Sequence, residues 1–139
     1  MTSAEHLYII IVGCGRLGSF LANRLSHEGH SVVVIDANAD AFEMLAADQF
    51  SGFTVEGDAT ELALLEQAKM DKADIVIGAT QDENVNIMAA QVAKNRFNVP
   101  KVIARIIDPN KEEFCRKLGI ECICQTLIAA EKMILSLNM

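Results

Sequence analysis

The six residues at 13–18 constrain the fold of this chain more than any other stretch. They have the pattern G-x-G-x-x-G, follow the apolar run 8–12, and stand directly before a helical pattern. In such a strand–turn–helix unit the first glycine permits a tight turn, the second lets a pyrophosphate approach the backbone, and the third lets the helix pack closely on the sheet. The free N–H groups at the helix start then face the phosphates. The stretch predicts a nucleotide site that includes Gly13, Cys14, Gly15, Arg16, Leu17 and Gly18.

Asp36 supplies the second part of this pattern, because it ends the next apolar run at the spacing expected for the motif's acidic residue. A carboxylate there accepts hydrogen bonds from ribose hydroxyls and repels a 2′-phosphate. We therefore expect NAD or an adenosine nucleotide rather than NADP, and we include Ala37 and Asn38 in the candidate site. A glycine-rich turn that binds no ligand is the alternative interpretation.

Length and composition restrict the class of protein. A chain of 139 residues predicts one domain, and 51% apolar with only 5% aromatic residues is typical of a parallel sheet covered by helices. The formal net charge of −7 argues against a nucleic-acid partner or an anionic membrane surface. No apolar run approaches the roughly 20 residues of a membrane span, and residues 1–6 lack the basic start of a signal peptide. We expect a soluble, cytoplasmic protein.

Strand and helix patterns alternate along the chain, with no signal for an antiparallel hairpin. The pattern predicts an α/β fold, a doubly wound parallel six-stranded Rossmann-type sheet of order 3-2-1-4-5-6. We expect the first helix to bury Leu17, Leu21 and Leu25 on one face. The six expected strands are 7–12, 32–36, 52–56, 73–78, 102–106 and 120–124.

Two further turns follow expected strands, at the carboxyl ends of the strands, where open α/β sheets bind ligands. The first turn consists of Gly57, Asp58, Ala59 and Thr60, and the second begins with Ala79 and Thr80. Asp58 has two interpretations, a cap for the next helix or a contact to the edge of an adenine. Thr80 and Glu83 fit a capping box, which explains both residues without a ligand.

Polar residues inside apolar runs need partners. Arg105 lies within the strand 102–106, where an unpaired charge is costly, so we expect it to reach a carboxylate or phosphate, with Asp108 or a neighbouring subunit as candidates. The four cysteines lack metal-ligand or disulfide spacing, and Cys122 and Cys124 are expected on one face of the last strand as small core residues. The histidines show no pattern that indicates catalysis.

The segment 125–139 predicts a helix that is apolar nearly all round, with Glu131 and Lys132 as its only charges. Such a helix must be buried. One side can pack on its own sheet, while the other needs a second protein surface. We expect a homodimer in which Ile134, Leu135 and Leu137 pack across a two-fold axis, and we divide the chain into a nucleotide-binding domain at 1–124 and a dimerisation helix at 125–139.

Taken together, these motifs resemble the N-terminal RCK (regulator of potassium conductance) domain, or TrkA-N domain, of bacterial potassium-uptake regulators. The resemblance covers essentially the whole chain, and the residues that carry it are the motif at 13–18, Asp36, the turn at 57–60, Ala79-Thr80 with Asn84, and Arg105. It implies a cytosolic nucleotide-binding module that is not an enzyme. It also implies dimers formed through the helix after strand six, which crosses to the neighbour, and octameric rings beneath a membrane potassium channel or transporter subunit.

The resemblance further implies roles for single residues. NAD(H), ATP, ADP or AMP would bias the conformation of the ring and thereby the potassium pathway. The glycines and Arg16 would contact phosphates, Asp36 the ribose, Asp58 and Ala59 the adenine, and Thr80 the middle of the ligand. Most relatives continue into a second, C-terminal RCK domain, whereas this sequence ends at Met139. That domain is then either on a separate partner polypeptide or missing from a fragment.

Two other classes compete with this interpretation. The glycine motif also serves NAD-dependent oxidoreductases, but one domain leaves no room for the usual substrate lobe, and His6, His27 and His30 lie away from the expected strand ends. A redox-sensing transcription factor would need a helix-turn-helix or a basic patch, and the sequence shows neither.

Overall fold

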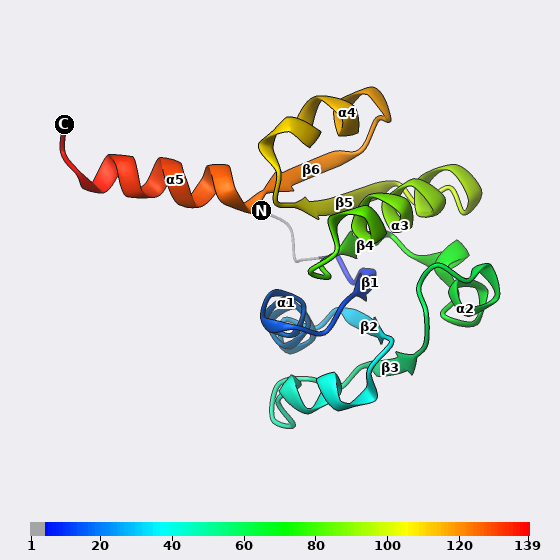
Figure 1. The fold of residues 1–139 in the computed structure, drawn as a ribbon. Coiled ribbons are helices and arrows are strands. Elements are labelled where there is room, and N and C mark those ends of the chain that lie inside the picture. The colour runs from blue at the N-terminus through cyan, green and yellow to red at the C-terminus, as the bar shows by residue number, and fades with distance from the viewer. Residues whose placement is uncertain (1–4) are drawn as a thin grey trace.

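The computed structural model describes residues 5–139 and shows one six-stranded sheet with helices on both faces (Figure 1). All neighbouring strands are parallel, and their order is β3-β2-β1-β4-β5-β6. This confirms the doubly wound fold expected from the sequence. The strands are β1 (Tyr8–Val12), β2 (Ser31–Asp36), β3 (Phe53–Glu56), β4 (Ile75–Gly78), β5 (Lys101–Ile106) and β6 (Glu121–Cys124).

Helices connect the strands, and three of the connections contain short 3-10 turns. Within residues 5–139 we find no helix with the length and hydrophobicity needed to cross a bilayer. The helical elements are α1 (Arg16–His27), η1 (Ala39–Met44), α2 (Leu62–Gln67), η2 (Met70–Lys72), α3 (Glu83–Arg96), η3 (Pro109–Lys111), α4 (Glu112–Lys117) and α5 (Gln125–Ser136).

The core consists of two apolar clusters, one on each face of the sheet. Alternate residues of β1 point to opposite faces, so Ile10 joins the cluster under α3 while Ile9 and Ile11 join the cluster under α1. The central strands are buried on both sides, which explains their continuous Val/Ile runs.

Helix α1 turns a different face to the sheet from the one expected. Its buried residues are Gly18, Ser19, Ala22 and Ser26, whereas Leu17 is 40% exposed and Leu21 and Leu25 are only partly buried. The cause is the close approach of the helix to the first turn, since a Cβ on Gly18 would collide with the Gly13 carbonyl. Small residues therefore form the contact, and the larger leucines lie at its side.

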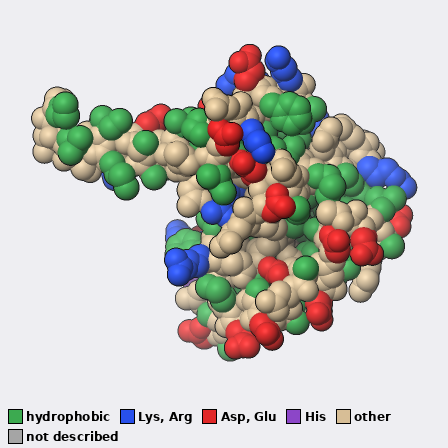
Figure 2. Space-filling model, viewed as in Figure 1, with side chains coloured by type: hydrophobic (Ala, Val, Ile, Leu, Met, Phe, Trp, Pro, Cys, Tyr) green, Lys and Arg blue, Asp and Glu red, His purple; other side chains and the backbone are tan. Residues whose placement is uncertain are grey.

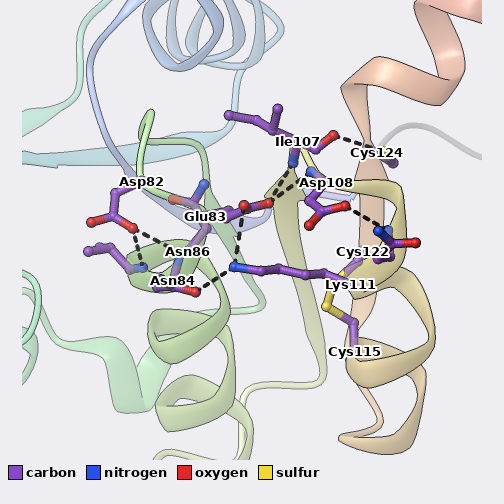
Figure 3. A network of polar contacts seen from close by, with 12 residues as sticks. Asp82, Glu83, Asn84, Asn86, Ile107, Asp108, Lys111, Cys115, Cys122 and Cys124 are labelled. Carbon is purple, nitrogen blue, oxygen red and sulfur yellow. Dashed lines mark hydrogen bonds and ion pairs between the residues drawn. A yellow bond between two sulfur atoms is a disulfide. The ribbon is translucent and has the colours of Figure 1, made fainter.

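A disulfide joins Cys115 of α4 to Cys122 of β6, with Cα atoms 6.2 Å apart (Figure 3). The expectation that no cysteines pair was wrong. The helix ends at Lys117, a turn with positive φ at Gly119 reverses the chain, and β6 then runs back beneath the helix. This reversal brings together two residues that are seven positions apart. Cys124 is buried in the core, as expected.

Helix α5 extends away from the sheet and does not fold back onto it (Figure 1). None of its residues is buried, and hydrophobic side chains line it in the space-filling view (Figure 2). The expectation that one side packs on its own sheet was wrong, apart from Leu127, which packs partly against the core. The reason is local: Cys124 ends β6 and Gln125 begins α5, so no loop reverses the chain.

Candidate functional site

Two adjoining hollows lie at the carboxyl ends of the central strands and share Gly13, Asp36 and Thr80. The β3-side hollow has a volume of about 270 Å³ and the β5-side hollow about 750 Å³. Together they form a crevice at the point where strand order reverses between β1 and β4, which is where this class of sheet binds ligands.

The glycine turn makes the floor of the crevice. Gly13 has φ of +107°, its N–H donates to the Ile35 carbonyl over 2.7 Å, and a Cβ on it would lie 2.8 Å from the Thr80 nitrogen. Gly15 caps α1, and a Cβ there would meet no atom within 4 Å. The space beside Gly15 is therefore open to a ligand, and within residues 5–139 no side chain caps the first N–H groups of α1.

Asp36 stands between the two hollows with its carboxylate fixed on both sides. Its Oδ2 accepts a hydrogen bond from the Cys14 N–H over 2.8 Å, and its Oδ1 accepts one from the Asn38 N–H over 2.8 Å. A carboxylate oxygen has more than one acceptor site, so each oxygen can also accept from a ribose hydroxyl.

Cys14 contributes its backbone rather than its thiol. The side chain is fully buried, and burial, followed by the charge of Asp36, raises the pKa of the thiol to about 11. The thiol is therefore neutral at physiological pH and is not a nucleophile.

The turn after β3 presents Gly57, Asp58 and Ala59 to the β3-side hollow. The Asp58 Oδ1 accepts hydrogen bonds from the Thr60 hydroxyl over 2.7 Å and the Thr60 N–H over 2.8 Å, which hold the pKa of Asp58 below its ordinary value. Helix α2 begins later, with Glu61 at its cap position, so the interpretation of Asp58 as a helix cap was wrong. The Thr60 hydroxyl donates to Asp58, and Thr60 does not line the hollow.

The start of α3 differs from the expected capping box. Asp82 caps the helix, because its Oδ1 accepts from the Asn84 N–H over 3.0 Å. The Glu83 carboxylate instead accepts from the backbone N–H groups of Ile107 at 2.8 Å and Asp108 at 3.1 Å (Figure 3), and these bonds lower the pKa of Glu83. Glu83 thereby ties α3 to the loop that follows β5.

Asn84, which we included in the candidate site, does not line the crevice, and a different asparagine of α3, Asn86, bonds to the crevice residue Thr80 from the core. The Asn84 side chain accepts a hydrogen bond from Lys111 at 2.9 Å (Figure 3). Asn86 is fully buried, and its Oδ1 accepts from the Thr80 N–H at 2.8 Å and the Thr80 hydroxyl at 2.7 Å. Its Nδ2 donates to the carbonyls of Thr80 and Arg105, both at 2.9 Å. A polar residue among the apolar positions of this helix was the signal that could have revealed it.

Arg105 reaches the crevice but pairs with neither a carboxylate nor Asp108. Its Nη1 donates to the Thr80 carbonyl over 2.9 Å and its Nε donates to the Gln125 Oε1 over 2.6 Å. Asp108 instead accepts from the Asn110 N–H at 2.9 Å. Arg105 and Arg16 are the basic side chains in the lining of the β5-side hollow, which therefore favours an anionic ligand group.

The structure brings most of the predicted site residues together. Those that line the crevice are Gly13, Gly15, Arg16, Leu17, Asp36, Ala37, Asn38, Gly57, Asp58, Ala59, Ala79, Thr80 and Arg105. Cys14 and Gly18 support the turn from behind. The lining residues that sequence reasoning missed include Ala41, Gln81, Asp82, Val85 and Gln125.

The two histidines His6 and His30 do not line the crevice. His6 forms hydrogen bonds with the Gly29 carbonyl and the Ser31 hydroxyl, and His30 accepts a hydrogen bond from the Leu7 N–H. Both histidines therefore lie near the amino ends of β1 and β2, away from the crevice at the carboxyl ends. Residues 5–139 contain no group of three or more His, Cys, Asp or Glu side chains placed to hold a metal ion.

Comparison with known proteins assigns the chain to a family. The model of the TrkA-N domain matches residues 9–126. The Trk system potassium uptake protein TrkA of Streptomyces coelicolor is 37% identical over 128 residues, which cover 92% of this chain and 57% of that protein. The chain spans about half the length of the curated relatives it matches.

Solved structures share the fold. The TrkA-N domain of the inner membrane protein ybaL from Escherichia coli has a TM-score of 0.83 at 19% identity, over 96% of this chain and 98% of that one. The GsuK channel bound to NAD has a TM-score of 0.77 at 23% identity, over 94% of this chain and 23% of that one. The sequence match and the shared fold agree: the chain belongs to the TrkA-N domain family.

Proposed function

We propose that this chain is the nucleotide-sensing regulatory domain of a potassium-transport system, and that NAD(H) or an adenine nucleotide (ATP, ADP or AMP) binds in the crevice. The observation that carries the proposal is Asp36, whose carboxylate is held between the two hollows by the N–H groups of Cys14 and Asn38. The adenine lies in the β3-side hollow beside Asp58 and Ala59, and Asp36 accepts the ribose hydroxyls.

The phosphates in this proposal lie in the β5-side hollow. Gly15 leaves room for them, the uncapped N–H groups of α1 face them, and Arg16 and Arg105 supply positive charge. The NAD in the GsuK channel structure supports a dinucleotide as one candidate. The larger volume on the β5 side accommodates either a second nucleoside or additional phosphates.

The role in potassium transport rests on the relatives. The Streptomyces protein is named for potassium uptake and not for an enzymatic reaction. We therefore place the domain in the cytoplasm, at the inner face of the membrane, bound to a potassium channel or transporter subunit. A ligand that binds two assembly shapes with different affinity shifts their populations and so changes transport. The further RCK domain of such regulators then lies on a continuation of this chain or on a separate polypeptide.

The assembly that we propose is a homodimer within an octameric ring, formed through segment 125–139 as a unit distinct from domain 1–124. An apolar groove of about 480 Å³ lies between α1 and the base of α5, where Ile77, Ile103 and Ile123 leave part of the sheet face uncovered. The exposed α5 of a second copy has the hydrophobic surface that fits such a groove.

An NAD-dependent oxidoreductase is the second candidate, and the crevice does not favour it. Hydride transfer needs a general acid or base beside the nicotinamide. Within the described residues, the β5-side hollow has Arg16, Arg105 and Asp36 as its ionisable lining, and Asp36 is already committed to the ribose position.

Calorimetry with NAD, NADH, ATP, ADP and AMP on the purified chain tests the proposal. We expect saturable binding of at least one of them at one site per chain, and weaker binding, by about 1.5–3 kcal/mol, in Asp36→Ala. Asp40→Ala is the matched control, because Asp40 is an exposed acid on η1 outside the crevice lining. Failure of all five nucleotides to bind contradicts the proposal, and turnover of NADH with a substrate would favour the oxidoreductase.

A further inference from the structure

We infer that Gln125 competes with a ligand phosphate for Arg105 and that, through this pair, a phosphate in the crevice is coupled to the seating of α5, meaning its attachment to the body of the domain. The inference rests on the proposed function, since it requires an anionic ligand group in the β5-side hollow. It goes beyond that function by naming the contact through which occupancy of the crevice reaches the projecting helix.

A continuous set of contacts joins the glycine turn to the first residue of α5. Gly13 packs directly against Thr80, and the Thr80 carbonyl accepts from the Arg105 Nη1 at 2.9 Å. The Nε of the same guanidinium donates to the Gln125 Oε1 at 2.6 Å. Asn86 fixes this arrangement from the core side, because it bonds the carbonyls of both Thr80 and Arg105. Arg105 therefore belongs to the wall of the crevice and to the base of α5 at once.

The seating of α5 depends on few contacts. Side chains of its first turn make two hydrogen bonds to the body of the domain, from Gln125 to Arg105 and from the Thr126 hydroxyl to the Ile107 carbonyl at 2.7 Å. The second bond ends on backbone that Glu83 holds in place. The first ends on a side chain that lines the ligand crevice. Beyond Leu127, no residue of α5 packs into the core clusters.

A phosphate and Gln125 compete for the same guanidinium. A phosphate adds ion-pair attraction and bidentate geometry to its hydrogen bonds with a guanidinium, and the neutral Gln125 amide supplies neither. A phosphate in the β5-side hollow therefore draws Arg105 toward the ligand and weakens its bond to Gln125. The coupling is reciprocal, so any change that strengthens the hold of α5 on Arg105 must weaken nucleotide binding.

The test is hydrogen exchange at the start of α5, measured on the full chain with and without ADP, together with ADP affinity by calorimetry. In the unmodified chain we expect ADP to speed exchange of the amides in residues 125–132. In Gln125→Ala we expect fast exchange without ADP, no further change on adding ADP, and ADP affinity higher than that of the unmodified chain. In Gln125→Glu we expect ADP affinity to fall by about tenfold, because the carboxylate pairs with Arg105 and repels the phosphate.

The opposite responses of the two variants separate competition for Arg105 from a merely structural role of Gln125, which would move ADP affinity in the same direction in both. Gln49→Ala is the matched control: it removes an exposed glutamine side chain that lies outside the crevice lining and outside α5. It should keep the exchange response to ADP.

Two failures are distinguishable. If ADP binds, but exchange of residues 125–132 is unchanged and Gln125→Glu keeps full affinity, the inference is overturned while the proposed function stands. If neither ADP nor the other nucleotides bind the unmodified chain, the proposed function fails and the inference fails with it.

Discussion

The Asp36 carboxylate accepts a hydrogen bond from the Cys14 N–H over 2.8 Å, which fixes the acid at the end of β2 against the middle of the glycine turn. Two sequence features that lie 22 positions apart thus form one unit. The acid is oriented before any ligand arrives, so little conformational entropy remains to be lost when a ribose binds.

We predict that Asp36→Ala weakens binding of NAD and adenosine nucleotides by about 1.5–3 kcal/mol, the range for losing hydrogen bonds to a charged group. Calorimetry on the variant and on Asp40→Ala measures the difference. Unchanged affinity in Asp36→Ala would rule out the ribose role. A modest loss of stability is also expected, because the N–H groups of Cys14 and Asn38 lose their acceptor.

Gly15 and Gly13 should respond differently to substitution. Among the described residues, a Cβ on Gly15 meets no atom within 4 Å, so Gly15→Val should leave the fold largely intact and abolish nucleotide binding by filling the phosphate position. Gly13 has φ of +107° and packs against Thr80, so Gly13→Ala should lower the thermal unfolding temperature as well. Circular dichroism and calorimetry on both variants check this pair. Normal ligand binding by Gly15→Val would place the phosphates elsewhere.

Much of the fold could be predicted because its determinants are local. Buried parallel strands read as continuous Val/Ile runs, and the glycine motif and Asp36 mark the ends of β1 and β2. The strand order was expected because the glycine motif is typical of doubly wound sheets with the order 3-2-1-4-5-6, and the structure has that order.

The contacts between elements could not be predicted in the same way. Thr80, Asn86, Arg105 and Gln125 come from four different elements or loops, and their hydrogen bonds depend on how those elements pack. The sequence offered Glu83 as a capping partner and Asp108 as the partner of Arg105, both plausible at short range. In the structure, Glu83 instead accepts a hydrogen bond from the Ile107 N–H, and Arg105 donates to Gln125. The two partners are 24 and 20 positions away in the sequence.

The disulfide between Cys115 and Cys122 should stabilise the domain when oxidised. Closing a loop of this length in the unfolded chain is worth about 2–2.5 kcal/mol in the loop-entropy estimate. Denaturant unfolding with and without reductant measures that difference, and peptide mapping should recover the two cysteines linked. The double variant Cys115→Ala with Cys122→Ser is the control, since reductant should leave its stability unchanged. Equal stability of the oxidised and reduced chain would contradict the prediction.

The last prediction concerns assembly and follows from the surface of α5. Ile134 is 61% exposed, Leu135 74% and Leu137 62%, although the helix carries few charges to keep it in water. A contiguous apolar surface of this kind is rare on a monomer. We therefore expect the unmodified chain to be a dimer or larger closed assembly at micromolar concentration by light scattering.

Replacing Ile134 and Leu137 together by Asp should give monomers or aggregates, because the change forces charge into a dry interface. The matched control is Ser136→Asp on the same helix, which adds one charge at a polar position and should keep the assembly. A monomeric unmodified chain would contradict the proposed homodimer. So would an Ile134→Asp, Leu137→Asp variant with the unmodified mass, since the apolar side chains of α5 would then lie outside the interface.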